Sequence, residues 1–472
     1  MLSQVTYRKV TAWCNGTPHH GFDTNSPVPA INSDTRTLKP GEVFLALKGN
    51  SFDGNAFVEE ATKRGAAAVI AQGKPKGNVP YLEVSDSLQS LIAIAREMRA
   101  LFHGPVVGIT GSAGKSSSKE MVATLLGPNT VASPASFNNL LGVSKTICLL
   151  QDDTQNLVLE MGMNAFGEIA ELCRSFGPEI GAITNIGDAH MGKLGGREGI
   201  YRAKKELFDF LASSQRARGV ALNTDDPLVL KAFDEAFTGQ TISTITYSTH
   251  AQSQADVTVL KSQFDPKTAF LTVEVRVEGQ PLSCTIPIFG THHVQNFAAS
   301  VALARLNHVT LNDIQSRAKN LRPASHRGEV IALPEGRTLI DESYNSNPTA
   351  LLSSLESLMR VDSGRRLVIV IGEMRELGDF TNEEHVRVGK KLAEWLIRRG
   401  RPVVVLGVGP ATEKLVAHLT SPLVATRCKM DVERATPTLL GLLQPQDVVF
   451  LKGSRGVKLD RLIPHLASGE IP

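Results

Sequence analysis

The sequence predicts an α/β fold of three domains, and three patterns carry that prediction. A chain of 472 residues exceeds what one hydrophobic core usually serves, so about three domains are expected. Apolar runs alternate with helical stretches through the middle and the end of the chain, which is typical of parallel sheets covered by helices. Residues 104–121 run from an apolar strand through a glycine-rich turn into a helix. We place the domains at 1–85, 86–325 and 326–472.

The N-terminal domain is expected to be a small α/β unit. Strands are predicted at 43–47 and 66–70, with a short helix at 56–63 between them. Apolar side chains then recur at helical spacing from Leu88 to Phe102, and Ser85 or Asp86 would cap this helix. The helix is expected to lead into the second domain.

The turn at residues 110–116 has the features that a polyphosphate needs. Glycines without a Cβ let backbone N–H groups approach phosphate oxygens, and the following helix directs its positive end at the same anion. Lys115 can reach the terminal phosphates, and the Ser116 hydroxyl can ligate Mg²⁺. Ile109 occupies the place of the first glycine of a strict P-loop, so we interpret the turn as a variant. The predicted nucleotide contacts are Gly111, Ser112, Ala113, Gly114, Lys115, Ser116 and Ser117.

Two polar positions follow later strands of the same predicted sheet. Glu160 ends the apolar strand 157–160, and His190 lies in the loop after strand 180–184. Ligands bind at the carboxyl ends of parallel strands, and carboxylates suit Mg²⁺. Glu160 is therefore a candidate magnesium ligand, and His190 a candidate metal or phosphate contact. The alternative interpretation is a solvent-facing acid and an incidental surface histidine.

The remaining pattern predicts an antiparallel appendage and a third sheet. Residues 271–277 alternate apolar and polar side chains, as in a half-buried antiparallel strand, and 265–267 predict a hairpin turn before them. In the last domain three apolar runs at 367–371, 403–406 and 448–451 each precede a glycine. This pattern is typical of a doubly wound, Rossmann-like α/β domain.

Several further polar loops are candidates for ligand contacts. Residues 136–143 are either a simple turn or a binding loop, with Ser136, Asn138 and Asn139 as its candidates. By charge alone, Lys204 and Lys205 are interpreted as part of a solvated helix face. Arg327 lies at the boundary between the second and third domains, where its planar fork suits a phosphate.

Two loops of the third domain pair charge with polar side chains. The loop 340–348 carries two carboxylates, Asp341 and Glu342, with amides, a combination that suits ribose hydroxyls or an amine nucleophile. Residues 452–456 form a basic, glycine-containing turn after the last strand, suited to a carboxylate.

Composition excludes several classes of protein. The formal net charge of +3 is small for this length, so neither nucleic acid nor an anionic membrane is expected as the main partner. The five cysteines are far apart and odd in number, which argues against a disulfide framework and suits a reducing cytoplasm. The first residues do not resemble a signal peptide, and no apolar run is long enough to span a bilayer.

These motifs, in this order, resemble the Mur ligase family of ATP-dependent amide-bond ligases in peptidoglycan precursor synthesis. The turn TGSAGKS resembles the family P-loop, and Arg327 resembles its inter-domain arginine. The stretch Gly290 to Asn296 is similar to the adenine-side motif, with His293 where the family usually has Asn. The segments 33–36, 47–49 and 52–54 resemble the uridine-nucleotide domain of later-acting members.

The resemblance implies ATP, two Mg²⁺ ions and a carbamylated lysine. It makes Lys115, Glu160, His190 and Lys204 the catalytic group, with Ser116, Glu160, His190 and Lys204 around the metals. It implies nucleotide contacts from Asn296 and Arg327, and a ribose contact from Asp341 or Glu342. The implied substrate-binding residues are Ser33, Asp34, Arg36, Lys48, Asp53, Ser136, Asn138, Asn139, Asn345, Asn347 and Arg455.

Within the family, the segments 341–348, 372–378 and 452–455 are most similar to those of the member that adds D-alanyl-D-alanine to UDP-N-acetylmuramoyl-tripeptide. The implied reaction activates the peptide carboxylate as an acyl phosphate and releases ADP and phosphate. A cytoplasmic monomer is expected. The alternatives are another amino-acid-adding Mur ligase, a folate-type polyglutamyl ligase, a P-loop ATPase or kinase with a different acceptor, and a weak homologue that only binds a uridine nucleotide.

Overall fold

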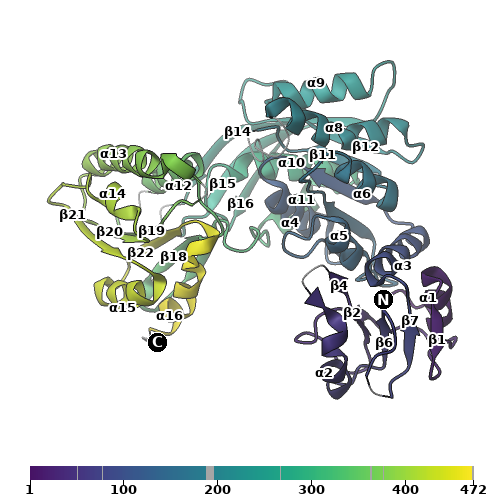
Figure 1. Cartoon of the computed structure of the whole chain (residues 1–472). Coiled ribbons are helices and arrows are strands. Elements are labelled where there is room, and N and C mark those ends of the chain that lie inside the picture. The colour runs from purple at the N-terminus through teal and green to yellow at the C-terminus, as the bar shows by residue number, and fades with distance from the viewer. Residues whose placement is uncertain are drawn as a thin grey trace. The chain divides into compact units, whose positions relative to one another are not determined.

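The computed structural model describes residues 1–49, 52–76, 78–187, 196–265, 267–361, 364–375 and 377–469 (Figure 1). The chain divides into two compact units, Met1–Thr246 with Ala302–Val309, and Tyr247–Val301 with Thr310–Pro472. Its large sheets are a five-stranded N-terminal sheet, a central sheet and a six-stranded C-terminal sheet. The predicted α/β class is therefore confirmed, and the three domain boundaries stay a prediction.

The N-terminal sheet has the order β1-β7-β6-β3-β2. Its strands pair in parallel except at β1, which is antiparallel to β7. The predicted helix after it is α3 (Ser87–Leu101), whose N-cap Asp86 accepts from the backbone of Leu88 and Gln89. The other elements are α1 (Tyr7–Cys14), β1 (Thr17–His19), β2 (Ile31–Asn32), β3 (Val43–Leu45), β4 (Lys48–Gly49), β5 (Phe52–Asp53), η1 (Gly54–Phe57), α2 (Val58–Lys63), β6 (Ala68–Ala71) and β7 (Tyr81–Glu83).

The central sheet positions the candidate phosphate site. Strand β8 (Val106–Thr110) pairs in parallel with β10 on one side and β11 on the other. The chain leaves β8 for β9 and β10, then crosses to β11 and β12, so the strand order reverses at β8. Ligands bind at such switch points. The other elements are α4 (Lys115–Leu126), β9 (Thr130–Ala132), α5 (Leu140–Ile147), β10 (Asn156–Glu160), α6 (Glu168–Phe176), β11 (Ile180–Ile183), α8 (Arg197–Ser213), β12 (Gly219–Asn223) and α9 (Pro227–Ala236).

The predicted antiparallel appendage is present in the second unit. Strand β15 (Leu271–Val277) pairs antiparallel with β14 (Val257–Phe264) and with β16 (Gln280–Ile286). Its odd-numbered apolar side chains are buried, as the alternation predicted. Asp265 accepts from the backbone of Lys267 and Thr268, which stabilises the turn between β14 and β15. The neighbouring elements are β13 (Thr244–Ser248), which spans the division between the units, α10 (His293–Leu306) and α11 (Leu311–Ala318).

The C-terminal sheet is doubly wound, as the sequence predicted. Its order is β17-β18-β22-β19-β20-β21, parallel except at β17. Successive residues of one strand enter different cores: Ile369 packs with α12 and α13, whereas Val368 packs with α15 and α16. The elements are β17 (Glu329–Ala332), η2 (Pro334–Gly336), β18 (Thr338–Glu342), α12 (Pro348–Arg360), β19 (Leu367–Gly372), η3 (Gly378–Phe380), α13 (Thr381–Arg399), β20 (Val403–Val408), α14 (Thr412–Val416), β21 (Val424–Lys429), α15 (Val432–Leu442), β22 (Val448–Lys452), η4 (Arg455–Val457), η5 (Leu459–Arg461) and α16 (Leu462–Ser468).

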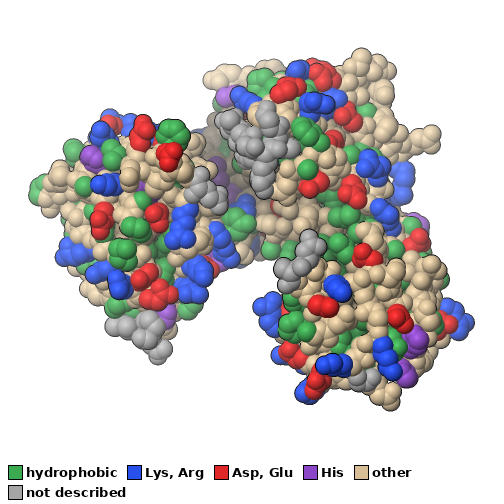
Figure 2. Space-filling view, in the orientation of Figure 1, with side chains coloured by type: hydrophobic (Ala, Val, Ile, Leu, Met, Phe, Trp, Pro, Cys, Tyr) green, Lys and Arg blue, Asp and Glu red, His purple; other side chains and the backbone are tan. Residues whose placement is uncertain are grey.

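The distribution of charged side chains on the surface is consistent with the small formal net charge of +3. Figure 2 shows basic and acidic side chains interspersed over the visible face. All five cysteines lie among the described residues and are free thiols. No helix in the described part of the chain is both long and apolar enough to cross a membrane.

Candidate active site

The glycine-rich turn joins β8 to α4 with a backbone that only glycine adopts easily. Gly111 has a φ of +152° and Gly114 a φ of +82°. A Cβ at Gly111 would lie 1.8 Å from the Thr184 hydroxyl oxygen, so a larger residue does not fit there. The Lys115 ammonium folds back and donates to the Gly111 carbonyl over 2.7 Å, while Ser116 and Ser117 are buried in the first turn of α4. The turn therefore has the shape that the P-loop interpretation requires.

A second segment, at the end of β11, holds this turn in place. The Asn185 side-chain oxygen accepts from the Ala113 N–H over 2.9 Å, and its carbonyl accepts from the Ser112 N–H over 3.0 Å. The Thr184 hydroxyl donates to the Ala113 carbonyl over 2.6 Å. Sequence analysis did not find this bracing role of Asn185, because its partners lie about seventy residues earlier.

Glu160 ends β10 beside β8 with one carboxylate oxygen unsatisfied. Its side chain is buried, and Oε1 accepts from the Asn138 amide over 3.0 Å. Oε2 is buried and has no hydrogen-bond partner among the described residues. A buried carboxylate oxygen without a donor is costly unless a cation or a donor arrives. Glu160 thus meets the geometric requirement for a Mg²⁺ ligand.

The loop that carries Asn138 is held by a buried lysine that the sequence did not single out. Lys119 on α4 donates to the carbonyls of Ser133 and Ala135, the latter over 2.7 Å. Asn139 begins α5 as its N-cap, accepting from the Gly142 N–H over 2.9 Å. Asn138 and Asn139 therefore have structural contacts of their own, and Ser136 lies half-buried between Ala135 and Asn138.

Lys204 on α8 is buried, so the solvated interpretation from charge alone is wrong for it. Burial, and then repulsion from Lys115, lowers the pKa of Lys204 to about 7. No hydrogen bond or ion pair joins its ammonium to the described residues of the chain. A lysine with a pKa near neutrality is in part a free amine at physiological pH, and so a nucleophile.

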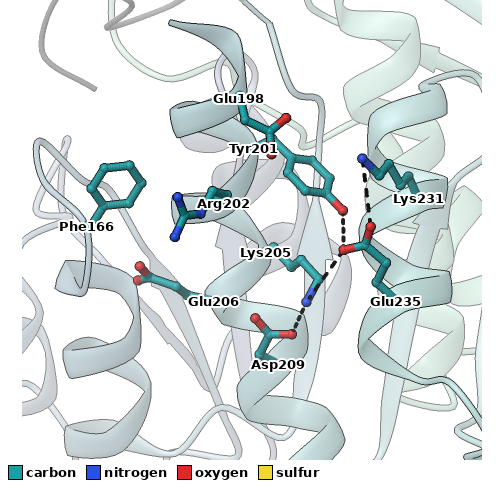
Figure 3. A pocket seen from close by; sticks show the side chains of 9 residues that line it. All are labelled: Phe166, Glu198, Tyr201, Arg202, Lys205, Glu206, Asp209, Lys231 and Glu235. Carbon is teal, nitrogen blue, oxygen red and sulfur yellow. Dashed lines mark hydrogen bonds and ion pairs between the residues drawn. The ribbon is translucent and has the colours of Figure 1, made fainter. Parts of the chain in front are cut away.

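The neighbouring Lys205 has the opposite environment. It lies on the outer side of α8, in an open hollow of about 500 Å³ between α8 and α9 (Figure 3). There Lys205 pairs with Asp209 over 2.5 Å, and Tyr201 donates to Glu235 over 2.7 Å. Opposite charges in this hollow pair with each other, so of the two lysines only Lys204 stays a candidate for the site. His190 lies outside the described residues.

The candidate substrate residues of the N-terminal domain form exposed polar loops. Arg36 makes a bidentate pair with Asp34, with Nη2 2.6 Å from Oδ2, and these hydrogen bonds hold the pKa of Asp34 down to about 2. Lys48 lies 3.8 Å from Asp53 in the β4–β5 hairpin. Ser33 is half-buried beside Asp34. These groups lie apart from the glycine-rich turn in sequence, and each loop is stabilised by its own pairs.

The second unit gathers the other candidate residues around Glu342, at the end of β18. Glu342 is buried; its Oε2 accepts from Lys452 over 3.0 Å and from Ser354. Burial raises the pKa of Glu342, but the charges of Lys452 and His292 outweigh burial and leave it below its ordinary value. Oε1 has no hydrogen-bond partner among the described residues, and His292 Nε2 lies 3.7 Å from it.

The adjacent carboxylate, Asp341, is fully engaged. Oδ2 lies 2.6 Å from His326 Nδ1, and Oδ1 accepts from the Ser343 N–H over 2.9 Å. His326 adopts a φ of +63°, uncommon for a residue with a Cβ, and this contact helps to hold it there. Of the two carboxylates, only Glu342 therefore presents an unsatisfied oxygen.

Two arginines lie against one aromatic ring in this unit. The Arg327 guanidinium is 4.0 Å from the centre of the Tyr344 ring, and that of Arg455 is 5.7 Å from it. Asn345 accepts from the Arg455 N–H over 3.4 Å, and Asn347 is the N-cap of α12. The loops after β18 and β22 thus form one cluster, because these two strands pair with each other in the sheet.

Asn296 lies on α10 with its amide 3.4 Å from His293 Nδ1. Asn296, Arg327, Glu342 and Arg455 all belong to the second unit, whereas the glycine-rich turn, Glu160 and Lys204 belong to the first. The structure thus gathers the predicted residues into two sets, one within each unit.

Comparison with known families identifies three matching segments. Residues 109–304 match the Mur ligase middle domain, residues 326–455 match the Mur ligase glutamate ligase domain, and residues 27–123 match the Mur ligase family catalytic domain. The matched segments contain the glycine-rich turn, Glu160, Lys204, Arg327 and Glu342.

Similar proteins match nearly the whole chain. A UDP-N-acetylmuramoyl-tripeptide–D-alanyl-D-alanine ligase of Synechocystis sp. is 32% identical over 92% of this chain and 91% of its own. A protein of that name in Escherichia coli is 30% identical over 98% of this chain and 99% of its own. A crystal structure of MurF from Acinetobacter baumannii superposes with a TM-score of 0.83 at 28% identity, covering 99% of each chain. A crystal structure of MurF ligase from Thermotoga maritima in complex with ADP has a TM-score of 0.71 at 26% identity. The match covers 93% of this chain and 97% of that one.

Proposed function

The chain belongs to the Mur ligase family, and from that premise we propose that it joins D-alanyl-D-alanine to UDP-N-acetylmuramoyl-tripeptide at the expense of ATP. It is an ATP-dependent, amide-bond-forming ligase of peptidoglycan synthesis. Relatives that cover 92–98% of the chain carry that enzyme's name, which confirms the predicted family and function. We assign residues 1–85 to the uridine nucleotide, 86–325 to ATP and 326–472 to the incoming dipeptide.

The single observation that supports this proposal best is the combination of charged groups around the glycine-rich turn. A P-loop alone serves any nucleotide-dependent enzyme. Here it accompanies a buried carboxylate with an unsatisfied oxygen, Glu160 Oε2, and a buried amine of lowered pKa, Lys204. Such groups fit an enzyme that must stabilise a strongly anionic transition state.

The residues fit a nucleotide with Mg²⁺. We assign Gly111 to Ser117 to the phosphates, with Lys115 releasing the Gly111 carbonyl to reach the γ-phosphate. Ser116 and Glu160 would hold Mg²⁺, and Lys204 with His190 would support a second ion. Bound Mg²⁺ would neutralise charge on the transferring phosphoryl group.

Lys204 is suited to carbamylation. Only the free amine adds to CO₂, and the pKa of about 7 makes that form abundant near neutral pH. The product is an anion, which removes the penalty of a buried ammonium beside Lys115 and supplies oxygen ligands that Mg²⁺ prefers.

On the nucleoside side, we assign the ribose contact to Glu342. Its Oε1 is without a hydrogen-bond partner in the described chain, whereas both oxygens of Asp341 are engaged by His326 and Ser343. A ribose hydroxyl is a donor that would satisfy Oε1. Arg327 would contact the phosphates and Asn296 the adenine, as the family resemblance implies.

For the peptide substrates, Arg455 would pair with the dipeptide carboxylate, with Asn345 and Asn347 beside it. Ser33, Asp34, Arg36, Lys48 and Asp53 would bind the uridine nucleotide, and Ser136, Asn138 and Asn139 the muramoyl peptide. We propose a cytoplasmic monomer.

In the reaction, the peptide carboxylate attacks the γ-phosphate and forms an acyl phosphate and ADP. The amine of D-alanyl-D-alanine then attacks the acyl carbon, and phosphate leaves as the amide forms. Both steps build negative charge, so Lys115 and Arg327 act by electrostatic stabilisation and positioning.

The test is phosphate release by the purified protein with ATP, Mg²⁺ and UDP-N-acetylmuramoyl-tripeptide, with and without D-alanyl-D-alanine. We expect release that depends on the dipeptide and yields the pentapeptide product. A kinase or ATPase with a different acceptor would release phosphate, or consume ATP, without dependence on the dipeptide, and that result would overturn the proposal.

A further inference from the structure

In the second unit, the buried His293 has a specific backbone partner. Its ring is fully buried at the start of α10, and Nε2 lies 2.8 Å from the Arg327 carbonyl oxygen. A carbonyl only accepts, so Nε2 carries the proton and donates. Nδ1 is then the accepting nitrogen, and the Asn296 amide lies 3.4 Å from it.

The buried ring is neutral, as this arrangement requires. Burial, and then the neighbouring His292, holds the pKa of His293 well below its ordinary value. The cationic groups near it, Arg327 and Lys452, act in the same direction. His293 is therefore a fixed, uncharged donor, and Nε2–H always faces the Arg327 backbone.

The segment that His293 contacts is held at three consecutive residues. Asp341 holds the side chain of His326, and His293 holds the carbonyl of Arg327. Gly328 makes two backbone hydrogen bonds: its N–H donates to the Asp341 carbonyl over 2.8 Å, and its carbonyl accepts from the Phe289 N–H over 2.9 Å. Gly328 has a φ of +93°, and a Cβ there would lie 3.0 Å from His293 Nε2. The histidine ring thus packs directly against this segment.

Fixing the backbone of Arg327 also fixes where its side chain begins. The guanidinium extends from that point to the Tyr344 ring, 4.0 Å away. We infer that His293 is a positioning residue, which holds the Arg327 backbone so that the guanidinium is preset for the nucleotide phosphates. The inference rests on the proposed function at one point, the assignment of Arg327 to the nucleotide phosphates.

A shorter side chain would not make this contact. The amide nitrogen of Asn is one bond closer to the backbone than that of Gln, whose reach approaches that of His Nε2. Because Gln can donate at about the same position, His293→Gln should preserve the function of the residue. His293→Asn should lose it while keeping a polar, folded interior, and His293→Phe should lose it while keeping the ring volume.

The experiment measures KM for ATP, kcat and the melting temperature for the wild type and these three variants. We expect His293→Phe and His293→Asn to raise KM for ATP about tenfold, the effect of one buried hydrogen bond, and His293→Gln to stay within about threefold. KM for the muramoyl tripeptide should be unchanged in all three.

A double-mutant cycle with Arg327→Ala separates positioning from simple destabilisation. In the Arg327→Ala background, His293→Asn should change KM for ATP less than about twofold, because its effect acts through Arg327. The inference is overturned if the tenfold effect persists in that background. It is also overturned if the variants lower only the melting temperature and leave KM for ATP unchanged. Absence of dipeptide-dependent phosphate release in the wild type would instead count against the proposed function.

Discussion

Two buried charged groups near the glycine-rich turn of the first unit lack the ionic partners that the buried carboxylates at the end of β18 in the second unit possess. In the first, neither Glu160 Oε2 nor the Lys204 ammonium has a hydrogen-bond partner among the residues that the structure describes. In the second, Glu342 is paired with Lys452, and Asp341 with His326. We infer from this difference that the proposed phosphate site depends on its ligands for charge compensation, whereas the charges at the proposed nucleoside site are largely compensated within the chain.

The largest effect expected from this difference is on stability in the second unit. Lys452→Met should destabilise the protein by about 3–5 kcal/mol, because it leaves the buried Glu342 carboxylate without its cation. Chemical denaturation measures the change. The control Lys390→Met, at an exposed position on α13, should be close to neutral.

The pairing can be checked by removing both charges. The double variant Lys452→Met with Glu342→Gln should recover most of the lost stability, since no buried charge then remains. Equal losses in the single and double variants would show that the pair is not what stabilises this end of the sheet.

On the phosphate side, Glu160→Gln should affect the rate rather than the fold. We expect kcat for dipeptide-dependent phosphate release to fall about 10²–10³-fold, as for other electrostatic groups in active sites. The melting temperature should be unchanged or higher, because an uncompensated buried anion is removed. The control Glu171→Gln, exposed on α6, should leave both quantities unchanged. A lower melting temperature with a normal rate would assign Glu160 to the fold.

A smaller effect should appear in the pH dependence of stability. The pKa of Lys204 falls from 10.5 in the unfolded chain to about 7 in the fold, so the unfolded state binds more protons between these values. The cost of burying Lys204 is therefore absent above pH 10.5, grows as pH falls, and is complete below about pH 7. In CO₂-free buffer, Lys204→Met should raise the melting temperature more at pH 6 than at pH 9. An equal rise at both pH values would contradict the lowered pKa.

The smallest effect concerns the bracing of the glycine-rich turn. Asn185→Ala removes the acceptor for the Ala113 N–H, and KM for ATP should rise by up to about tenfold with kcat little changed. The control is Asn156→Ala. Asn156 begins β10, at the end of that strand opposite to Glu160. No change in KM for ATP would show that the side chain of Asn185 is not needed to hold the turn.

The sequence was sufficient for those parts of the fold that depend on local patterns. The apolar run 106–110, its glycines and the following helix are contiguous, so this strand and its turn could be predicted, although the place of the strand in the sheet could not. Glu160 could be found because it is the polar last residue of an apolar strand. The alternation at 271–277 likewise showed a half-buried strand.

Contacts between distant residues could not be predicted in this way. Lys119 looks like a surface residue of α4, but its carbonyl partners come from a loop fourteen to sixteen residues later. Lys452 and Glu342 are 110 residues apart, and His293 and Arg327 are 34 apart. Which of these groups meet is decided by strand order, and the local sequence does not encode it.

The most direct test of the central claim, that ATP activates the peptide carboxylate, follows the oxygen atoms. UDP-N-acetylmuramoyl-tripeptide labelled with ¹⁸O in its reacting carboxylate is incubated with the protein, ATP, Mg²⁺ and D-alanyl-D-alanine, and the phosphate is analysed by mass spectrometry. An acyl phosphate transfers one labelled oxygen to each phosphate released. Release of unlabelled phosphate would show that water or another acceptor attacked ATP, and would contradict the account.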